Sequence, residues 1–503
     1  MKTNRRIGIS VASVAIAGVA LTGCGTGGSG GESVAESKDI TWMTVVHTPT
    51  TPEKDGPVEK AIEDATGYNI NFQWIPAASA GEKLTAALAS NKLADVVTLN
   101  SINSSPMRKA QADGQFWEVS EYLDDYPNLS KIDEQTRTDA SIDGKLYGVP
   151  MLKYKARYGV LVRQDWLDNL GLEVPHTLDE LADVARAFTN DDPDGNGKDD
   201  TTGFIDRQES FGVGLRSLSG YFGAGSVFEV NDDGDMVASF TTDAFKEAME
   251  WYKGLYDEGA VNEEFITLQK QNQYDAIAQS KGGIVVTGLF EATGFMSLAE
   301  SADPNTTMQW ALVDDMTYKD VPRRILSDTA GGVGGWYAMP KSEVKDEEEL
   351  RSVLDFLDKM STDEVFGLMT NGVEGEHFTF DDKGSVSITD QAVWDAEVQP
   401  FKSSRMSEVA LTYPSNVQYQ NEAEDKMAGQ AEYAVTNPAQ SLTSPTFDAR
   451  WNEVNTAIGD AYTKYMVGQL TMEDYEAAIE KERAGDLGKI EAEFTAAYKE
   501  ING

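Results

Sequence analysis

The sequence predicts an α/β protein with two lobes. Strands and helices alternate over residues 40–99, and such alternation is typical of a βαβαβ unit, in which a parallel sheet carries helices on both faces. The alternation gives way to a mainly helical stretch at residues 165–260 and returns in mid-chain. A pattern that stops and returns in this way favours two lobes that are linked by several crossings of the chain.

The first five elements follow from hydrophobic periodicity and helix signals. Apolar or alternating runs predict strands at residues 40–46, 68–74 and 94–99. Helix signals cover residues 57–65 and 82–91, and Pro57 stands in the first turn of the earlier helix. Because ligands of parallel sheets bind beyond the carboxyl ends of the strands, we expect a ligand near residues 47–51, 76–80 and 100–105.

The later elements complete this interpretation. Residues 146–151 and 158–163 are extended and predict crossings between the lobes. Thr177 and Glu180 have the spacing of a capping box at the start of a helix. The remaining helices are expected at residues 165–170, 177–189, 245–258, 347–360, 450–467 and 472–498, the remaining strands at 282–288 and 335–340, and hairpin turns at 231–235 and 381–384.

The charge balance argues against two classes of partner. The chain has 503 residues, with 42 Lys and Arg against 84 Asp and Glu, and a net charge of −42. A surface this acidic repels a phosphate backbone and shows no basic stripe, so nucleic acid is excluded as a partner. Adhesion to an anionic lipid surface through basic residues is disfavoured for the same reason.

The N-terminus has the organisation of an export signal. Three basic residues within positions 1–6 precede an apolar run at 7–21, which ends in Leu21-Thr22-Gly23-Cys24. An ordinary signal peptide with an incidental cysteine would look similar, but the single Cys of the chain stands where a bacterial lipobox places its acylated residue. We therefore expect a signal peptide at 1–23, lipid on Cys24 and a Gly/Ser-rich tether at 24–38, which would hold the protein on the outer face of a bacterial cell membrane. One Cys also excludes an intrachain disulfide and a Cys-based zinc site.

One loop has the spacing of a calcium site. Oxygen-bearing side chains stand at positions 1, 3, 5 and 9 of the loop, and Gly197 stands at position 6. Position 12, where an EF-hand has a bidentate Glu, is Gly203. The bland alternative is a polar turn between helices; we predict a structural Ca²⁺ site whose ligands are Asp192, Asp194, Asn196, the backbone carbonyl of Lys198, and Asp200.

Catalytic motifs do not emerge from the sequence. It contains no P-loop, no G-x-S-x-G and no H-E-x-x-H, and its one S-x-x-K at residues 342–345 lacks the accompanying K-T-G and S-D-N. The three His residues, His47, His176 and His377, fit no zinc spacing. Pairs of carboxylates suited to glycoside hydrolysis are uninformative in a chain with 84 acidic residues.

Several segments together resemble a known family. The most specific are Arg163-Gln-Asp-Trp-Leu, Leu170-Gly-Leu, Pro175-His-Thr-Leu-Asp-Glu and Phe188-Thr-Asn-Asp-Asp-Pro-Asp-Gly-Asn-Gly-Lys; weaker ones are Leu255-Tyr-Asp-Glu-Gly, Tyr337-Ala-Met-Pro, Asn371-Gly-Val-Glu-Gly-Glu-His and Asn437-Pro-Ala-Gln-Ser. These segments resemble the extracellular solute-binding lipoproteins of carbohydrate ABC importers, in the long subgroup that includes alginate-binding and LplA-like proteins. The resemblance spans nearly all of the chain after the tether.

The resemblance implies a fold and a function. The fold is a two-lobe, periplasmic-binding-protein-like α/β fold with a hinge, an interlobe cleft for an oligosaccharide, and a calcium loop; family members often carry Glu at position 10 of that loop, where this chain has Thr201. The function is non-catalytic capture of the oligosaccharide by a monomer and its delivery to the membrane subunits of an ABC importer. The expected N-terminal lobe covers residues 39–155 and 291–345, and the expected C-terminal lobe covers residues 156–290 and 346–503.

A sugar site requires aromatic platforms and polar side chains. The candidates stand at strand ends, in glycine-rich breaks or in the family-like segment: His47, Asn100, Tyr221, Phe222, Phe290, Trp336, Glu374, His377 and Tyr413. Three other functions stay open. They are a secreted lipid-anchored glycoside hydrolase, a lipoprotein of the same architecture that binds peptides or metal chelates, and a structural surface lipoprotein without a small ligand.

Overall fold

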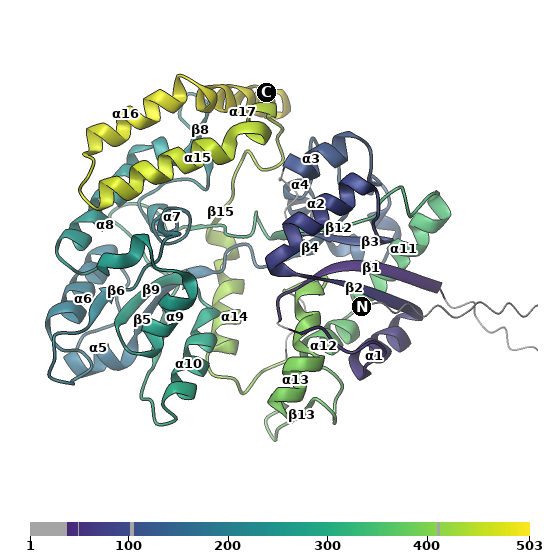
Figure 1. The fold of residues 1–503 in the computed structure, drawn as a ribbon, viewed down its shortest axis with the longest axis horizontal. Helices are drawn as coiled ribbons and strands as arrows, with labels where there is room; N and C mark the ends of the chain where they lie inside the picture. The colour runs from purple at the N-terminus through teal and green to yellow at the C-terminus, as the bar shows by residue number, and fades with distance from the viewer. Residues whose placement is uncertain (1–37, 49, 101–104, 410–412, 503) are drawn as a thin grey trace, which may run out of the picture. The chain divides into compact units, whose positions relative to one another are not determined.

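The computed structural model describes residues 38–48, 50–100, 105–409 and 413–502. The expected signal peptide, Cys24 and all of the expected tether except Lys38 lie outside the described residues. Among the described residues, no helix has the length and apolar character needed to cross a membrane. The two largest sheets lie in different parts of the described chain, one on each side of the view in Figure 1.

The first sheet has five strands in the order β2-β1-β3-β12-β4. These are β1 (Lys38–Val46), β2 (Tyr68–Pro76), β3 (Val96–Leu99), β4 (Val149–Leu152) and β12 (Val333–Ala338). β1 pairs in parallel with β2 and β3, which confirms the predicted parallel unit, whereas β12 runs antiparallel to β3 and β4. The hydrophobic core around the first sheet includes side chains of α1 (Pro57–Thr66), α2 (Ala80–Ser90), α3 (Ser105–Ala112), α11 (Glu347–Met360) and α12 (Asp363–Asn371).

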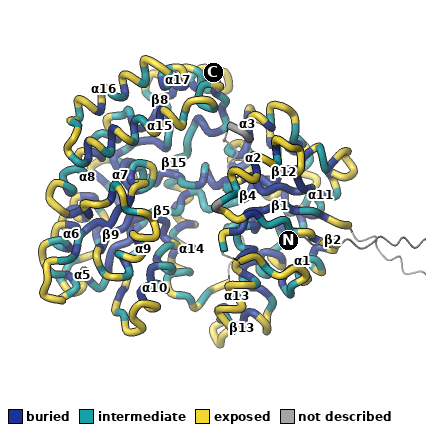
Figure 2. The backbone as a smooth tube through the Cα atoms, viewed as in Figure 1, coloured by how far each residue is buried: buried dark blue, intermediate teal, exposed yellow. Residues whose placement is uncertain are grey.

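The second sheet has four strands in the order β10-β5-β9-β6. These are β5 (Tyr158–Arg163), β6 (Thr202–Phe204), β9 (Gly282–Gly288) and β10 (Trp310–Val313). Successive side chains of a strand point to opposite faces, and on β5 Val160 and Val162 enter one hydrophobic core while Leu161 enters another. Both faces are therefore covered, which explains why the central strands β5 and β9 are largely apolar and buried, as Figure 2 shows.

Helices supply the remainder of both cores. One face of the second sheet packs with α5 (Gln164–Leu170), α6 (Leu178–Asn190), α7 (Gly214–Tyr221), α8 (Asp243–Asp257), α15 (Pro445–Met466), α16 (Met472–Arg483) and α17 (Asp486–Asn502); the other packs with α9 (Lys270–Ala278), α10 (Glu291–Ala302) and α14 (Gln420–Gly429). The predicted capping box of α6 is confirmed. The single helix predicted at 472–498 is wrong, because the chain turns at Gly485 and a Cβ at Gly488 would lie 2.2 Å from the carbonyl oxygen of Arg483.

Short elements complete the chain. The two predicted hairpin turns are confirmed: they join β7 (Phe228–Val230) to β8 (Met236–Ala238), and β13 (Phe378–Phe380) to β14 (Val386–Ile388). A two-stranded pair joins β11 (Ile325–Leu326) to β15 (Ala434–Val435). The remaining helices are α4 (Glu134–Asp139) and α13 (Gln391–Glu397), and the 3₁₀ helices include η7 (Gln399–Ser404).

The chain passes between the two sheets at more than one place. Residues 153–157 connect β4 to β5, and residues 314–332, which include the short strand β11, connect β10 to β12. The expected boundary after residue 155 falls in the first passage. The expected boundaries after residues 290 and 345 differ from the observed packing, because β10 pairs with β5 of the second sheet and α11 and α12 pack in the core of the first.

Candidate functional site

Two adjoining cavities are lined by residues from both halves of the described chain. A half is here one of the two large sheets together with the helices that pack against it. Their volumes are about 300 Å³ and about 420 Å³, and they share Tyr154, Glu424 and Met427. The first cavity is lined by Thr370 of α12 and by Thr293 of α10. The helix α12 packs in the core of the first sheet, and the helix α10 packs in a core of the second. A ligand in this cavity would therefore contact both halves at once, which is the arrangement expected of a site between two lobes.

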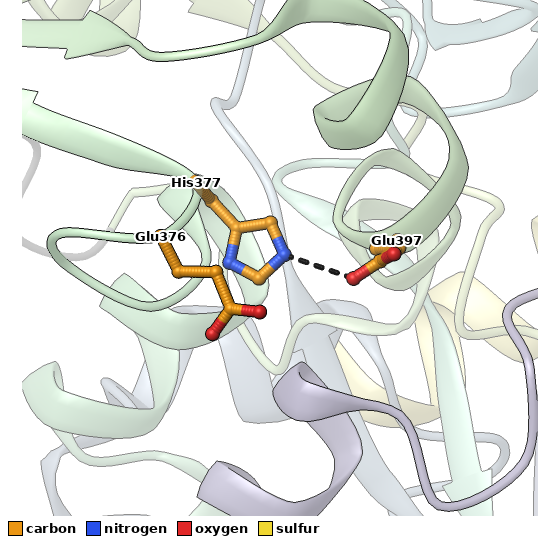
Figure 3. A group of neighbouring side chains, drawn as sticks. All are labelled: Glu376, His377 and Glu397. Carbon is orange, nitrogen blue, oxygen red and sulfur yellow. Dashed lines mark hydrogen bonds and ion pairs between the residues drawn. The ribbon is translucent and has the colours of Figure 1, made fainter.

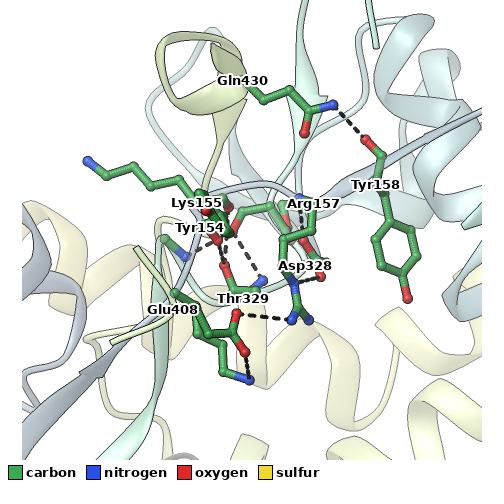
Figure 4. Close-up of polar contacts among 12 residues, drawn as sticks. Tyr154, Lys155, Arg157, Tyr158, Asp328, Thr329, Glu408 and Gln430 are labelled. Atoms are coloured by element: carbon green, nitrogen blue, oxygen red, sulfur yellow. Dashed lines mark hydrogen bonds and ion pairs between the residues drawn. The ribbon is translucent and has the colours of Figure 1, made fainter. Parts of the chain in front are cut away.

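An ion-pair network ties the passages between the sheets together (Figure 4). The Arg157 guanidinium lies 2.8 Å from Asp328, and its backbone N–H donates to the same carboxylate at 2.9 Å. Arg157 and Lys153 also reach the two oxygens of Glu408, at 3.5 Å and 3.3 Å. Although burial opposes it, Asp328 and Glu408 raise the pKa of Arg157 above its ordinary value. These cations are thus already neutralised by the protein's own acids.

A second pair of cations, Lys402 and Arg405, lines the first cavity. The segment that carries them packs against the carboxyl end of β1, where the Ser403 hydroxyl donates to the Val45 carbonyl at 2.8 Å. The cavity therefore lies beyond the end of a parallel strand, as expected for this class of sheet. Burial, and then the adjacent charge of Arg405, lower the pKa of Lys402 to about 8.

Phe290 is the aromatic side chain that fits the sequence prediction best. It lines the first cavity and is 40% exposed. A Cβ at Gly288 would lie 2.3 Å from the Phe290 ring, so the glycine lets the ring fold back against the end of β9. The guanidinium carbon of Arg157 stands 5.3 Å from the ring centroid. The ring and this cation together form one wall of the cavity.

His47 and Asn100 follow β1 and β3, as predicted, and both are exposed. Enclosure by its surroundings, followed by the charge of Lys153, lowers the pKa of His47. Lys153 lines the second cavity, but neither His47 nor Asn100 is among the residues that line either cavity. Their part in binding stays a prediction.

Three predicted binding residues do not lie at the cavities. Tyr221 and Phe222 are 3% and 5% exposed within the core of the second sheet, and Trp336 is 1% exposed within the core of the first. The Trp336 ring N–H donates to the backbone carbonyl of Ala140 at 2.9 Å. Side chains packed in this way present no face to a ligand, so these three predictions are corrected.

The family-like segment at residues 371–377 directly precedes β13. Glu374 and Tyr413 are exposed, and the Tyr413 ring stands 5.3 Å from that of Phe380, so it packs on the β13–β14 hairpin. His377 is fully buried. None of the three lines either cavity, and the burial of His377 makes it a structural residue rather than a ligand contact.

His377 forms a cluster with Glu376 and Glu397 (Figure 3). The backbone N–H of Val373 donates to Nδ1 of His377 at 3.0 Å, so Nε2 carries the proton and donates to Glu397 at 3.2 Å. Both ring nitrogens are thus engaged, and a metal ion at Nε2 would displace the proton that this arrangement requires. The cluster is best explained as the closure of a loop.

The predicted calcium loop gathers its polar side chains. The amide nitrogen of Asn196 lies 2.7 Å from Asp194 and 3.1 Å from Asp200, and Asp192 accepts from the backbone N–H of Gly197 at 2.9 Å. Gly197 has φ +74°, the left-handed conformation that the tight turn needs. Hard oxygens of three carboxylates and an amide suit Ca²⁺, so the residues present fit the ion.

Two details distinguish this loop from an EF-hand. A Cβ at Gly203 would lie 2.5 Å from the carbonyl oxygen of Ala185, so position 12 has no room for a bidentate side chain. The Lys281 ammonium lies 3.0 Å from the second oxygen of Asp200, where it would compete with a cation. Any calcium site here is therefore weaker than a complete EF-hand loop.

Sequence reasoning missed the charged lining of the cavities, namely Tyr154, Arg157, Lys402, Arg405, Glu408 and Glu424. Glu424 lies on α14 and Lys402 on the short helix η7, whereas the other four residues belong to passages and irregular segments that have no hydrophobic period. The spacing of Lys402 and Arg405 in the sequence also does not distinguish them as binding residues from the other cations among the 42 Lys and Arg of the chain.

Comparison with known proteins identifies relatives over most of the chain. A family model described as "Bacterial extracellular solute-binding protein" matches residues 48–365. The polygalacturonan/rhamnogalacturonan-binding protein YtcQ of Bacillus subtilis is 32% identical over 501 residues, which cover 98% of this chain and 99% of YtcQ. Lipoprotein LipO of the same organism is 29% identical, covering 92% of this chain and 93% of LipO. The fold is similar to that of the S. pneumoniae ABC-transporter substrate-binding protein FusA in complex with kestose, with a TM-score of 0.66, 18% identity, and coverage of 92% of this chain and 99% of FusA.

Proposed function

Because the chain belongs to the family of bacterial extracellular solute-binding proteins, we propose that it captures an oligosaccharide between its two sheets and delivers it to an ABC importer. The observation that carries the proposal is the pair of adjoining cavities with walls from both halves of the chain. Their aromatic, hydroxyl and charged lining suits the C–H faces and hydroxyls of sugars. The printed names of YtcQ and FusA support a carbohydrate ligand.

The proposed role is binding without turnover. Solute-binding relatives such as FusA and YtcQ are named for what they bind. In this proposal the two halves close over the sugar by a hinge motion at the passages between the sheets, and the loaded monomer docks on the importer. In the proposal, Phe290 is the platform for a sugar ring, and the exposed side chains of His47 and Asn100 are further candidates for contacts with sugar hydroxyls.

Anchoring through lipid on Cys24 is a further part of the proposal. It rests on the lipobox-like sequence at residues 21–24, and the name of the relative LipO agrees with it. The anchor would keep the protein on the outer face of the bacterial cell membrane, within reach of the importer.

The proposal also includes a structural Ca²⁺ ion held by Asp192, Asp194, Asn196 and Asp200 with the backbone of Lys198. A solved structure of the similar-fold FusA is described as an EF-hand mutant, which supports calcium binding in this group of folds. Millimolar calcium at about 100 times its dissociation constant would stabilise the chain by about 2.7 kcal/mol. Asp192→Asn should remove the thermal shift, whereas Asp233→Asn, an exposed acid in a hairpin turn, should retain it.

A thermal-shift screen of the chain from residue 25 tests the proposed function. Neutral and acidic oligosaccharides are compared with peptides, in calcium, and bound glycans are recovered and their length is measured. A shift with one glycan series, recovered intact, is the expected result. A shift with peptides alone would overturn the carbohydrate assignment, and shortened glycans would identify a hydrolase.

A further inference from the structure

Lys402 and Arg405 differ from Arg157, the third cation of the first cavity, in having no acidic partner. Among the described residues, no carboxylate lies within ion-pair distance of either, whereas Arg157 and Lys153 are both paired. The Lys402 ammonium stands 5.3 Å from the centroid of the Trp394 ring, and the Arg405 guanidinium carbon 5.2 Å from that of Phe366. Aromatic faces of this kind compensate a desolvated charge only in part.

The donors of Arg405 are only partly used by the protein. Its Nε donates to the Lys402 carbonyl at 3.1 Å and its Nη1 to the Thr370 hydroxyl at 3.0 Å. These two bonds fix the plane of the guanidinium. Among the described residues no acceptor is recorded for Nη2, so Nη2 and the three protons of the Lys402 ammonium remain for a ligand.

Two like charges gathered in a cavity are unfavourable unless an anion joins them. Glu408 and Glu424 line the same cavity, but neither lies within ion-pair distance of Lys402 or Arg405, and Glu408 is already engaged by Arg157 and Lys153. Glu408 and Glu424 favour the charged forms of both cations from beyond ion-pair distance, and sugar hydroxyls would accept hydrogen bonds from these cations without adding a negative charge beside them. A carboxylate would accept one bond from each cation and neutralise one of the charges.

We propose that Lys402 and Arg405 bind a carboxylate of the ligand, so that the captured oligosaccharide is an acidic glycan that carries uronate residues. The inference rests on the proposed function and narrows its substrate class. It also accounts for how a chain with a net charge of −42 accepts an anion, because the attraction is local and the site is partly shielded from the surface charge. Glu408 and Glu424 then remain as acceptors for hydroxyls of the same glycan.

The test is calorimetric titration of the chain from residue 25 with oligogalacturonates of defined length, their fully methyl-esterified forms, neutral oligosaccharides and a sulfated oligosaccharide. We expect the acid to bind and its ester to bind at least about tenfold more weakly, since hydrogen bonds to charged groups contribute this much or more. Lys402→Met and Arg405→Gln should each weaken binding of the acid about 10- to 100-fold. Lys359→Met removes a half-buried cation that is paired with Asp355 and lines neither cavity; it is the matched control and should leave the affinity unchanged.

A further readout separates a direct contact from a structural role. Affinity for the acid should fall as the pH rises above about 8, because free Lys402 loses its proton there. Arg405, Glu408 and Glu424 are the charged groups that face Lys402. Lys402→Arg, which keeps its charge, should bind the acid with an affinity that does not vary with pH over that range.

The outcomes separate the two proposals. If the ester or a neutral glycan binds as tightly as the acid, or if the folded Lys402 and Arg405 variants retain full affinity for it, the uronate inference is overturned while glycan capture stands. Tighter binding of the sulfated glycan would replace the carboxylate by a sulfate ester and also overturn the inference. If no glycan binds at all, the proposed function itself is contradicted.

Discussion

Replacing Lys402 by Met should stabilise the ligand-free protein, although the side chain is well packed. In most half-buried positions a substitution lowers the free energy of unfolding. Lys402 is different because the folded chain holds its charge in a partly desolvated cavity beside Arg405, which lowers its pKa from 10.5 to about 8. Met keeps most of the apolar stem and removes the charge.

The pKa shift gives the size of the effect. A difference of about 2.5 pKa units corresponds to about 3 kcal/mol of unfavourable free energy at neutral pH, at 1.36 kcal/mol per unit. Loss of the contact with Trp394 costs about 0.5–1 kcal/mol. The expected net gain in the free energy of unfolding is therefore about 2 kcal/mol.

The pH dependence has a definite sign. The pKa is lower in the folded than in the unfolded chain, so the unfolded chain holds more protons between about pH 8 and pH 10.5. The stability of the wild type should therefore rise through this window relative to that of Lys402→Met, and the advantage of the variant should shrink towards zero.

Urea unfolding of protein refolded to remove any bound ligand measures this difference at several pH values. Lys402→Arg serves as the control and should show no gain. If Lys402→Met is less stable than the wild type at neutral pH, or if its gain is the same at neutral and alkaline pH, the description of Lys402 as an uncompensated cation is refuted.

Three further predictions follow from other parts of the chain. Lys281→Met should raise calcium affinity about two- to fivefold in a calcium titration, because it removes a competing surface charge from Asp200. Gly203→Ala should lower the free energy of unfolding by about 1–3 kcal/mol in urea because its Cβ would overlap backbone, whereas Gly254→Ala, within α8 and with open space around it, should not destabilise. Cys24→Ala should shift the protein from the membrane fraction to the medium of a bacterial host, as measured by fractionation.

Features that depend on neighbouring residues in the sequence could be predicted. The capping box at Thr177 and Glu180, the turns of the two hairpins, and the left-handed Gly197 all have their causes within a few residues. The parallel unit of β1, β2 and β3 also followed from local alternation. This parallel unit is the feature from which the α/β class of the fold was predicted.

The aromatic residues that stand beside glycines were wrongly predicted to bind the ligand. A glycine can make room for close packing of the chain as well as for a ligand. A Cβ at Gly220, beside Tyr221, would lie 2.7 Å from Leu326, and one at Gly335, beside Trp336, would lie 2.1 Å from the Leu99 carbonyl oxygen. Gly220 lets α7 approach β11, and Gly335 lets β12 approach β3. This close packing buries the aromatic rings next to the two glycines. Sequence alone does not separate this cause from a binding loop.

The charged lining of the cavities could not be predicted for another reason. Lys402 and Arg405 lie far along the chain from β1, yet the segment that carries them packs on the end of that strand through Ser403 and Ser404. Only tertiary packing brings them to the ligand end of the first sheet. The inference that Lys402 and Arg405 bind a carboxylate depends on their having no acidic partner, and this too is a property of the folded chain.

Calorimetric titration of the refolded, ligand-free chain with an oligogalacturonate, followed by mass spectrometry of the glycan, tests the central claim most directly. The account predicts saturable binding of one glycan per chain and recovery of the glycan at its original length. Recovery of shorter products would contradict capture without turnover, and the absence of binding to this and to neutral oligosaccharides would contradict the assignment of a carbohydrate ligand.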